Sequence, residues 1–85
     1  ACTYEVPLKG TVRIGRNPDC NLVLDRPSVS KYQCEISVQE GRAYIRNLSS
    51  TNRTQVNGHP LMEAEALPET FTLTMGNEKM KAVIR

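Results

Sequence analysis

Short stretches of alternating hydrophobic and polar residues recur along the chain. Residues 11–14 and 35–39 alternate with a period of two, which is typical of strands that bury one face and expose the other. Residues that favour turns separate these stretches at short intervals, and regularly spaced short strands indicate a sandwich or a barrel. The sequence therefore predicts an all-β fold.

Two dipeptides define the clearest predicted hairpins. Glu40-Gly41 joins residues 34–39 to residues 42–48 as a two-residue turn. Asn57-Gly58 predicts a type I′ turn, because both residue types tolerate a positive φ. A third hairpin is expected to close the chain, with residues 69–75 and 78–85 on either side of a Gly-Asn turn.

Residues 60–67 are the one stretch whose composition favours a helix. Pro60 and Pro68 limit it to one or two turns, because proline interrupts a helix interior. We therefore expect a loop or a short helical turn at this place.

The length of 85 residues predicts one domain, spanning residues 1–85, in which all elements share one hydrophobic core. The chain has no tryptophan and one phenylalanine, so this core is expected to be aliphatic. The expected core residues are Val12, Ile14, Leu22, Val23, Leu24, Ile36, Val38, Tyr44, Ile45, Phe71, Leu73, Val83 and Ile84.

The charge pattern argues against nucleic-acid and membrane partners. The formal net charge is +2, and the basic residues are scattered instead of forming a stripe interleaved with aromatic residues. No apolar run approaches the ~20 residues that span a bilayer, and the first residues do not resemble a signal peptide. We expect a soluble protein with no nucleic-acid partner and no membrane insertion, and we expect it to be part of a larger multidomain protein.

The residues that catalysis requires are scarce. The single histidine, His59, lies beside the predicted Asn57-Gly58 turn, and the nine carboxylates show no motif spacing. The chain has no GxGxxG or GxxxxGK[ST] segment to hold a nucleotide. We therefore expect no enzyme activity, no catalytic residues and no cofactor.

The three cysteines, Cys2, Cys20 and Cys34, show no CxxC spacing and are odd in number. Neither a disulfide framework nor a metal site is expected from such a pattern. Reduced thiols that pack as small apolar groups indicate the cytoplasm or another reducing intracellular compartment.

Polar residues suited to holding an oxyanion gather at three predicted strand ends. Loops at one end of a sandwich lie close together, so these residues are expected to share a site. A guanidinium, an ammonium, hydroxyl groups and backbone N–H groups are the donors that a phosphate requires. The three pairs are Gly15-Arg16, Ser30-Lys31 and Thr51-Asn52.

These pairs fall in three blocks that together resemble the forkhead-associated (FHA) domain family. Residues 13–25 resemble its opening strand, which ends in Gly-Arg and is followed by a turn and an aliphatic strand. Residues 27–36 are similar to its Ser-x-x-His block, and residues 47–58 to its Asp-Leu-x-Ser-x-Asn-Gly-Thr-x-Val-Asn-Gly segment. Three blocks in the right order are far more specific than any single one, although they cover only about half of the chain.

The resemblance implies an antiparallel β-sandwich of eleven short strands, FHA/SMAD-like, with binding loops at one end. It further implies binding of a phosphothreonine-containing protein or peptide, in signalling or regulated assembly. On this basis Arg16 contacts the phosphate, Ser30 and Lys31 bond its oxygens, and Thr51 lines the same pocket. Asn52 holds the backbone of the bound peptide.

Two residues depart from the family pattern. Gln33 stands where the family usually has a histidine that braces the loops together with Gly15, and glutamine still donates and accepts hydrogen bonds. Arg53 replaces a glycine of the family pattern. If the backbone there requires a positive φ, a non-glycine residue is strained. The alternative is that Arg53 is an accessory cation that adds positive charge near the ligand. These departures leave open a phospho-independent scaffold domain with the same fold. A third hypothesis is nucleic-acid binding through Arg13, Arg16, Lys31 and Arg53.

Overall fold

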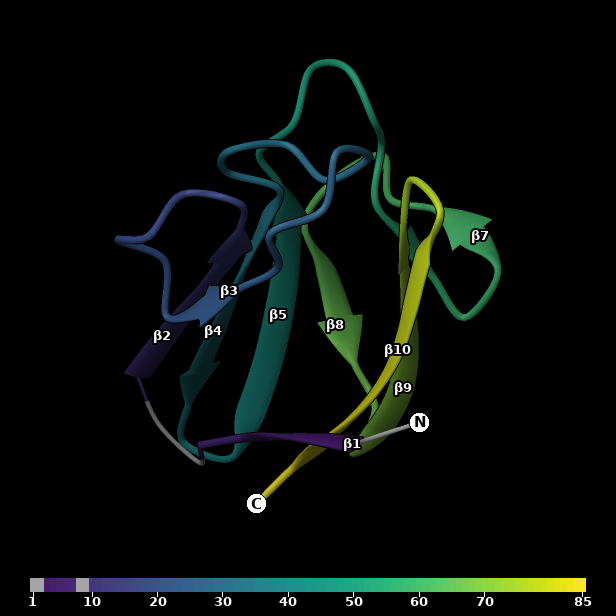
Figure 1. Cartoon of the computed structure of the whole chain (residues 1–85). Helices are drawn as coiled ribbons and strands as arrows, with labels where there is room; N and C mark the ends of the chain where they lie inside the picture. The colour runs from purple at the N-terminus through teal and green to yellow at the C-terminus, as the bar shows by residue number, and fades with distance from the viewer. Residues whose placement is uncertain (1–2, 8–9) are drawn as a thin grey trace.

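A computed structural model of the chain describes residues 3–7 and 10–85 and shows a sandwich of two β-sheets (Figure 1). The described residues form ten strands, whereas the family resemblance implied eleven. The strands are β1 (Thr3–Val6), β2 (Gly10–Gly15), β3 (Leu22–Val23), β4 (Cys34–Gln39), β5 (Arg42–Asn47), β6 (Gln55–Val56), β7 (His59–Pro60), β8 (Glu65–Leu67), β9 (Thr70–Met75) and β10 (Glu78–Ile84).

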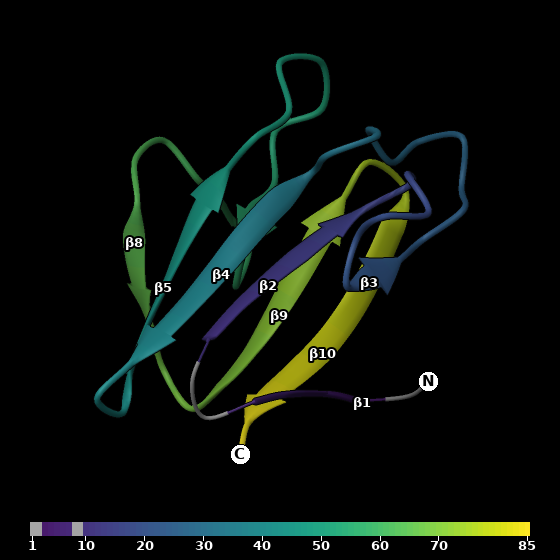
Figure 2. The same cartoon turned by 90° about the vertical axis from the view of Figure 1, so that its left-hand side faces the viewer.

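Each sheet contains five strands, and Figure 2 shows the two layers facing each other. One sheet has the order β1-β10-β9-β6-β7 and the other β3-β2-β4-β5-β8. Most neighbours are antiparallel, as expected, but β1 pairs with β10 and β2 pairs with β3 in parallel. The all-β sandwich is therefore confirmed, with two mixed sheets in place of purely antiparallel ones.

The predicted hairpins are confirmed at the residues expected. Gln39 pairs with Arg42 across the first turn, where Glu40 and Gly41 have φ values of 52° and 76°. Asn57 and Gly58 also have positive φ values, 49° and 89°, as a type I′ turn requires. The last hairpin joins β9 to β10.

The segment 60–67 contains no helix, and the expectation of a loop or helical turn is wrong at both of its ends. Pro60 belongs to β7, an edge strand, where a residue without an N–H group is tolerated. Residues Glu65–Leu67 form β8 and pair with β5. The backbone groups along the free edge of β5 pair with this segment, and this pairing outweighs its local helix propensity.

The core is aliphatic, as expected, but two predicted members lie outside it. Val23 is 42% exposed and Tyr44 is 45% exposed, because each follows a more deeply placed residue and points to the opposite face of its strand. Leu22, Leu24 and Ile84 pack against the core while remaining partly buried, and Val83 is also only partly buried. Buried residues that the alternation did not indicate are Val6, Val29, Ala43, Val56, Leu61, Met75 and Ala82.

Two of the three cysteines lie in the described part of the chain. Cys20 and Cys34 are free and buried, and burial raises the pKa of the Cys34 thiol to about 12. Cys2 lies outside the described residues. Within the described ranges, no helix is long and apolar enough to cross a membrane.

Candidate functional site

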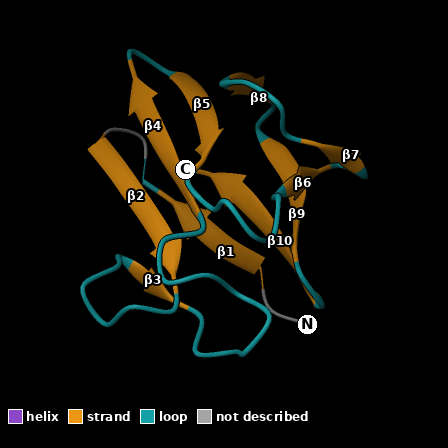
Figure 3. Cartoon of the chain, turned by 90° about the horizontal axis from the view of Figure 1, so that it is seen from above, coloured by secondary structure: helices purple, strands orange, loops and turns teal. Residues whose placement is uncertain are grey.

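The loops that carry the predicted residues meet at the end of the sandwich opposite the C-terminus (Figures 1 and 3). Two backbone hydrogen bonds join the residues directly after β2 to the loop between β3 and β4. The Arg16 N–H donates to the Ser30 carbonyl at 2.9 Å, and the Asn17 N–H donates to the Lys31 carbonyl at 3.1 Å. Gly15-Arg16 and Ser30-Lys31, distant in sequence, are thereby held side by side.

Gly15 permits this close approach. A Cβ atom at this position would lie 2.1 Å from the Lys31 carbonyl oxygen and 2.8 Å from its carbon. No side chain fits at such distances, since the obstacle is backbone and not a flexible side-chain end. The glycine is therefore required by contact between two chain segments, and its predicted loop-bracing role has this physical basis.

Arg16 and Lys31 line one shallow cavity of about 330 Å³. The Nε of Arg16 donates to the Val29 carbonyl at 3.0 Å, and this bond fixes the orientation of the guanidinium group. Among the described residues, no carboxylate lies within 4.0 Å of either cationic group. The Nη groups of Arg16 and the Nζ of Lys31 therefore remain available to an anion. The other lining residues are Asn17, Pro18, Val23 and Asp25.

Hydroxyl groups from the β3–β4 and β5–β6 loops lie close together. The Ser30 Oγ lies 2.6 Å from the Ser49 Oγ and 3.3 Å from the Thr51 Oγ1. The Ser49 Oγ also accepts hydrogen bonds from the backbone N–H groups of Thr51, at 3.3 Å, and Asn52, at 3.0 Å. Ser30 and Thr51 are thus brought together as predicted, whereas Ser49 was not anticipated.

Gln33 is fully buried and links the same two loops. Its Oε1 accepts from the Ser30 N–H at 3.0 Å, while its Nε2 donates to the Asn52 carbonyl at 2.6 Å. The Nε2 also donates to the Thr54 Oγ1 at 3.0 Å. The amide therefore makes bonds in both directions, which is the bracing that the sequence predicted for this position.

The side chain of Asn52 points back into the protein. Its Nδ2 donates to the Ser28 carbonyl at 3.0 Å, so that it fixes the loop between β3 and β4. The turn between β9 and β10 secures Ser28 from the other side, because the Asn77 N–H donates to the Ser28 Oγ at 3.1 Å. An ion pair between Arg26 and Glu78, 3.6 Å apart, joins the same segments.

Arg53 adopts an ordinary negative φ, since the only described non-glycine residues with positive φ are Glu40 and Asn57. The glycine that the family carries here is therefore not required by this backbone. The Nη1 of Arg53 donates to the Leu61 carbonyl at 3.1 Å. This bond holds the guanidinium against the segment after β7, and the cavity of Arg16 and Lys31 is not lined by Arg53.

A second set of contacts closes the loop between β2 and β3. The Tyr32 hydroxyl donates to the Asp19 carboxylate at 2.9 Å, and this bond, with the adjacent negative charge, raises the pKa of Tyr32. The Cys20 thiol donates to the Lys31 carbonyl at 3.5 Å, and burial raises its pKa. Both loops that carry Arg16 and Lys31 are thus fixed by side chains as well as by backbone bonds.

Sequence reasoning missed several residues that support the site. Thr54 is fully buried, and its Oγ1 donates to the Asn47 Oδ1 at 3.0 Å. Asn47, Thr54 and Ser49 all belong to the third motif block, but a motif does not distinguish a supporting side chain from a contacting one. Ser28 was missed because the partner of its hydroxyl, the Asn77 N–H, lies in the turn between β9 and β10, which the motif blocks do not include.

A family model for the FHA domain matches residues 12–76, which include every site residue that the sequence predicted. The chain belongs to the FHA domain family. Its curated relatives include the proliferation marker protein Ki-67 of Mus musculus, 50% identical over 61 residues and 72% of this chain. The Ki-67 protein of Homo sapiens is 38% identical over 65 residues, or 76% of this chain. This FHA chain spans 2% of the length of each of these relatives.

The fold agrees with solved FHA structures. One, described as a structural and functional analysis of phosphothreonine-dependent FHA domain interactions, is 29% identical and has a TM-score of 0.77. The alignment covers 88% of this chain and 78% of that one. The family and the fold thus agree with the resemblance of the three sequence blocks.

Proposed function

We propose that this FHA domain binds a phosphothreonine-containing segment of another protein at its loop end. The observation that carries the proposal is that Arg16 and Lys31 line one cavity and that no carboxylate of the described residues lies within 4.0 Å of the cationic group of either. A phosphothreonine carries about −1.5 to −2 charges at pH 7 and offers three acceptor oxygens. The solved relative described by its phosphothreonine-dependent interactions supports the same function.

The proposal assigns each predicted residue a specific task. Arg16 presents its Nη fork to two phosphate oxygens, because its Nε is occupied by Val29 and fixes its direction. Lys31 supplies a second positive charge, and the Ser30 and Thr51 hydroxyls donate to the remaining oxygens. Asn52 retains its Oδ1 for a backbone N–H of the peptide, since its Nδ2 is bonded to Ser28.

The relatives also bear on the setting in which such a domain acts. Both Ki-67 proteins are far longer than this chain, so we propose that the domain acts as one module of a larger protein in signalling or regulated assembly. The free, buried thiols of Cys20 and Cys34 suit a reducing intracellular compartment, which we propose as its location.

Calorimetry with matched peptides that carry phosphothreonine, phosphoserine or plain threonine tests the proposal. Arg16→Ala is expected to weaken phosphothreonine binding by roughly 10- to 150-fold, because a hydrogen bond to a charged group contributes about 1.5–3 kcal/mol. Arg16→Lys keeps the charge but loses the two Nη donors. Its affinity for the phosphothreonine peptide is expected to lie between those of wild type and Arg16→Ala. Arg42→Ala at the opposite end is the matched control, and its affinity is expected to stay within twofold.

Equal binding of phosphorylated and plain peptides would overturn the proposal and favour a phospho-independent scaffold. Steep loss of binding with salt, together with indifference to peptide sequence, would favour a nucleic-acid partner instead. Thermal unfolding of Arg16→Ala separates binding from folding. We expect a small change in stability, since an exposed arginine contributes little to the core.

A further inference from the structure

Within the hydroxyl cluster described above, the partly buried contact between Ser49 and Ser30 has a hydrogen-bond direction that the other partners of the Ser49 Oγ determine. A serine hydroxyl has one proton to donate and two lone pairs with which to accept. Two of the three partners of this oxygen are backbone N–H groups, those of Thr51 and Asn52, which can only donate. Both lone pairs are therefore occupied.

The direction of the hydrogen bond between Ser49 and its third partner, the Ser30 hydroxyl, follows from this. The Ser49 proton must be donated to the Ser30 Oγ, 2.6 Å away, a distance typical of a strong O–H···O bond. The hydroxyl of Ser30 accepts this bond and keeps its own proton. The one other contact of the Ser30 hydroxyl among the described residues is the longer one to Thr51, at 3.3 Å.

We propose that Ser49 is a positioning residue that sets Ser30 as a hydrogen-bond donor toward the phosphate. A phosphate dianion only accepts hydrogen bonds, so a serine whose proton were used elsewhere would repel it. Donation from Ser49 also polarises the Ser30 hydroxyl and makes it a better donor. The two backbone N–H groups thus fix the direction of a chain of hydrogen bonds that runs from Ser49 through Ser30 to the ligand.

This inference rests on the proposed phosphothreonine binding and assigns a role that the sequence did not indicate. Ser50, the next residue, is exposed and has no side-chain hydrogen bond among those described, so it provides a matched control. The same substitution at the two adjacent serines therefore separates hydrogen-bond order from a general effect of removing a hydroxyl from this loop.

The test is a double-mutant cycle on phosphothreonine peptide affinity, with the variants Ser49→Ala, Ser30→Ala and the two combined. Weak complexes are followed by NMR titration to millimolar peptide, so that every Kd is measured. Ser49→Ala is expected to weaken binding about fivefold to tenfold, as for the loss of one hydrogen bond. In the Ser30→Ala background the same change is expected to have less than a twofold effect, and Ser50→Ala is expected to leave the affinity within twofold.

An effect of Ser49→Ala that persists undiminished without the Ser30 hydroxyl would overturn the inference, because Ser49 would then act only by holding the loop. An unchanged affinity of Ser49→Ala would overturn it as well. In both cases the wild-type domain would still prefer the phosphorylated peptide, and the proposed function would stand. Equal wild-type binding of phosphorylated and plain peptides would overturn both.

Discussion

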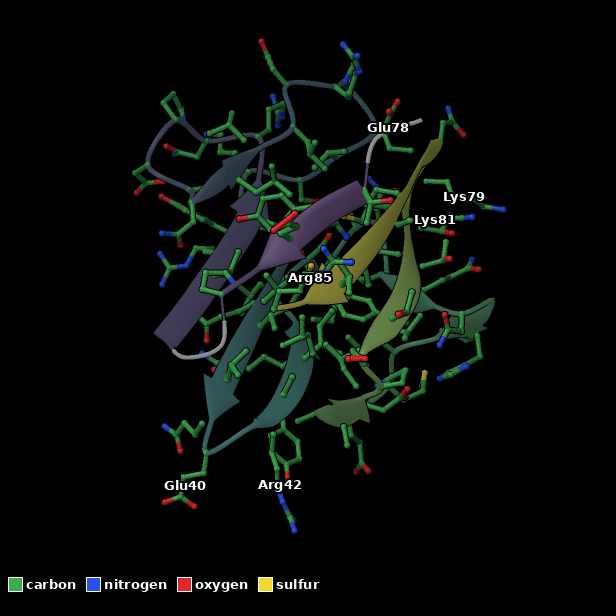
Figure 4. All side chains as sticks on the ribbon, turned by 90° about the horizontal axis from the view of Figure 1, so that it is seen from below. Glu40, Arg42, Glu78, Lys79, Lys81 and Arg85 are labelled. Carbon is green, nitrogen blue, oxygen red and sulfur yellow. The ribbon has the colours of Figure 1, made fainter. Side chains whose placement is uncertain are left out.

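The two ends of the sandwich are built in different ways. At one end, β4 and β5 are joined by Glu40-Gly41 alone, and the strand ladder runs to the last pair, Gln39 and Arg42. Figure 4 shows Glu40 and Arg42 extending outward from this turn. At the other end, residues 24–33 form no strand, and side chains such as Gln33 and Asn52 add their bonds to a few backbone hydrogen bonds.

The difference shows what a binding site requires of a small sandwich. A two-residue turn satisfies its own backbone and leaves no groups to spare for a ligand. A long loop exposes donors and acceptors but loses conformational entropy when it is ordered, at a cost of roughly 1–2 kcal/mol per residue. In this domain polar side chains such as Gln33 provide the compensating bonds. Arg16, Ser30 and Lys31 are therefore presented on loops that are already fixed.

The largest expected effect comes from a glycine comparison between the two ends. Gly15→Ala places a Cβ 2.1 Å from the Lys31 carbonyl oxygen, so two backbone segments must separate. We expect a loss of about 3 kcal/mol in the free energy of unfolding, equivalent to roughly 10–20 °C in Tm. Gly41→Ala meets no atoms within 4 Å and has only its positive φ against it, so a loss of about 1 kcal/mol is expected.

Denaturant unfolding of the two variants measures this comparison. If Gly15→Ala and Gly41→Ala were equally stable, the contact between β2 and the Lys31 segment would not be tight, and the two ends would tolerate change alike. Binding provides a second readout, because Gly15→Ala is expected to displace Lys31 and to weaken phosphopeptide binding in the fraction that remains folded.

A smaller effect is expected at Gln33, the amide that joins the two loops. Gln33→Leu preserves the buried volume but removes the bonds to Ser30, Asn52 and Thr54. Leaving such groups without partners costs about 1–3 kcal/mol each when water cannot reach them. Because the loops are partly accessible, we expect a total loss of about 2 kcal/mol and roughly tenfold weaker phosphopeptide binding.

Gln33→His is the matched variant, since the FHA family usually carries histidine at this position. A neutral imidazole offers one donor and one acceptor, so it can replace two of the three bonds. Its thermal stability and its affinity for the phosphopeptide, measured by calorimetry, are expected to lie between those of wild type and Gln33→Leu. If Gln33→Leu bound the phosphopeptide as tightly as wild type, the loops would be ordered without this amide, and the contrast between the two ends would be weaker.

The same contrast explains how far the sequence could predict the structure. The hairpins were predictable, because alternation and turn dipeptides such as Asn57-Gly58 are local and are not overridden by distant contacts. The segment 60–67 was not predictable in this way, since its pairing with β5 depends on a free strand edge that appears only in the folded domain.

The candidate site was predictable only in part. Arg16, Ser30, Lys31 and Thr51 were predicted from motif and chemistry, and the structure places them around one end. The supporting bonds of Ser49 and Ser28 were not predictable, because they depend on the atomic positions of loops with no repeating pattern. The direction of the Asn52 side chain, toward the Ser28 carbonyl, was unpredictable for the same reason.

The smallest expected effect lies at the end of the sandwich that carries the Glu40-Gly41 turn. Glu40 has a φ of 52°, a conformation that costs energy for most residues but that asparagine adopts readily. Glu40→Asn creates an Asn-Gly turn and is expected to stabilise the domain by about 0.5 kcal/mol, with Glu40→Ala as the control for loss of the charge alone. Denaturant unfolding measures the gain, and calorimetry is expected to show an unchanged Kd for the phosphopeptide. A change in Kd would contradict the independence of the two ends, because β4 would then carry strain from the turn to Cys34 and the adjacent Gln33.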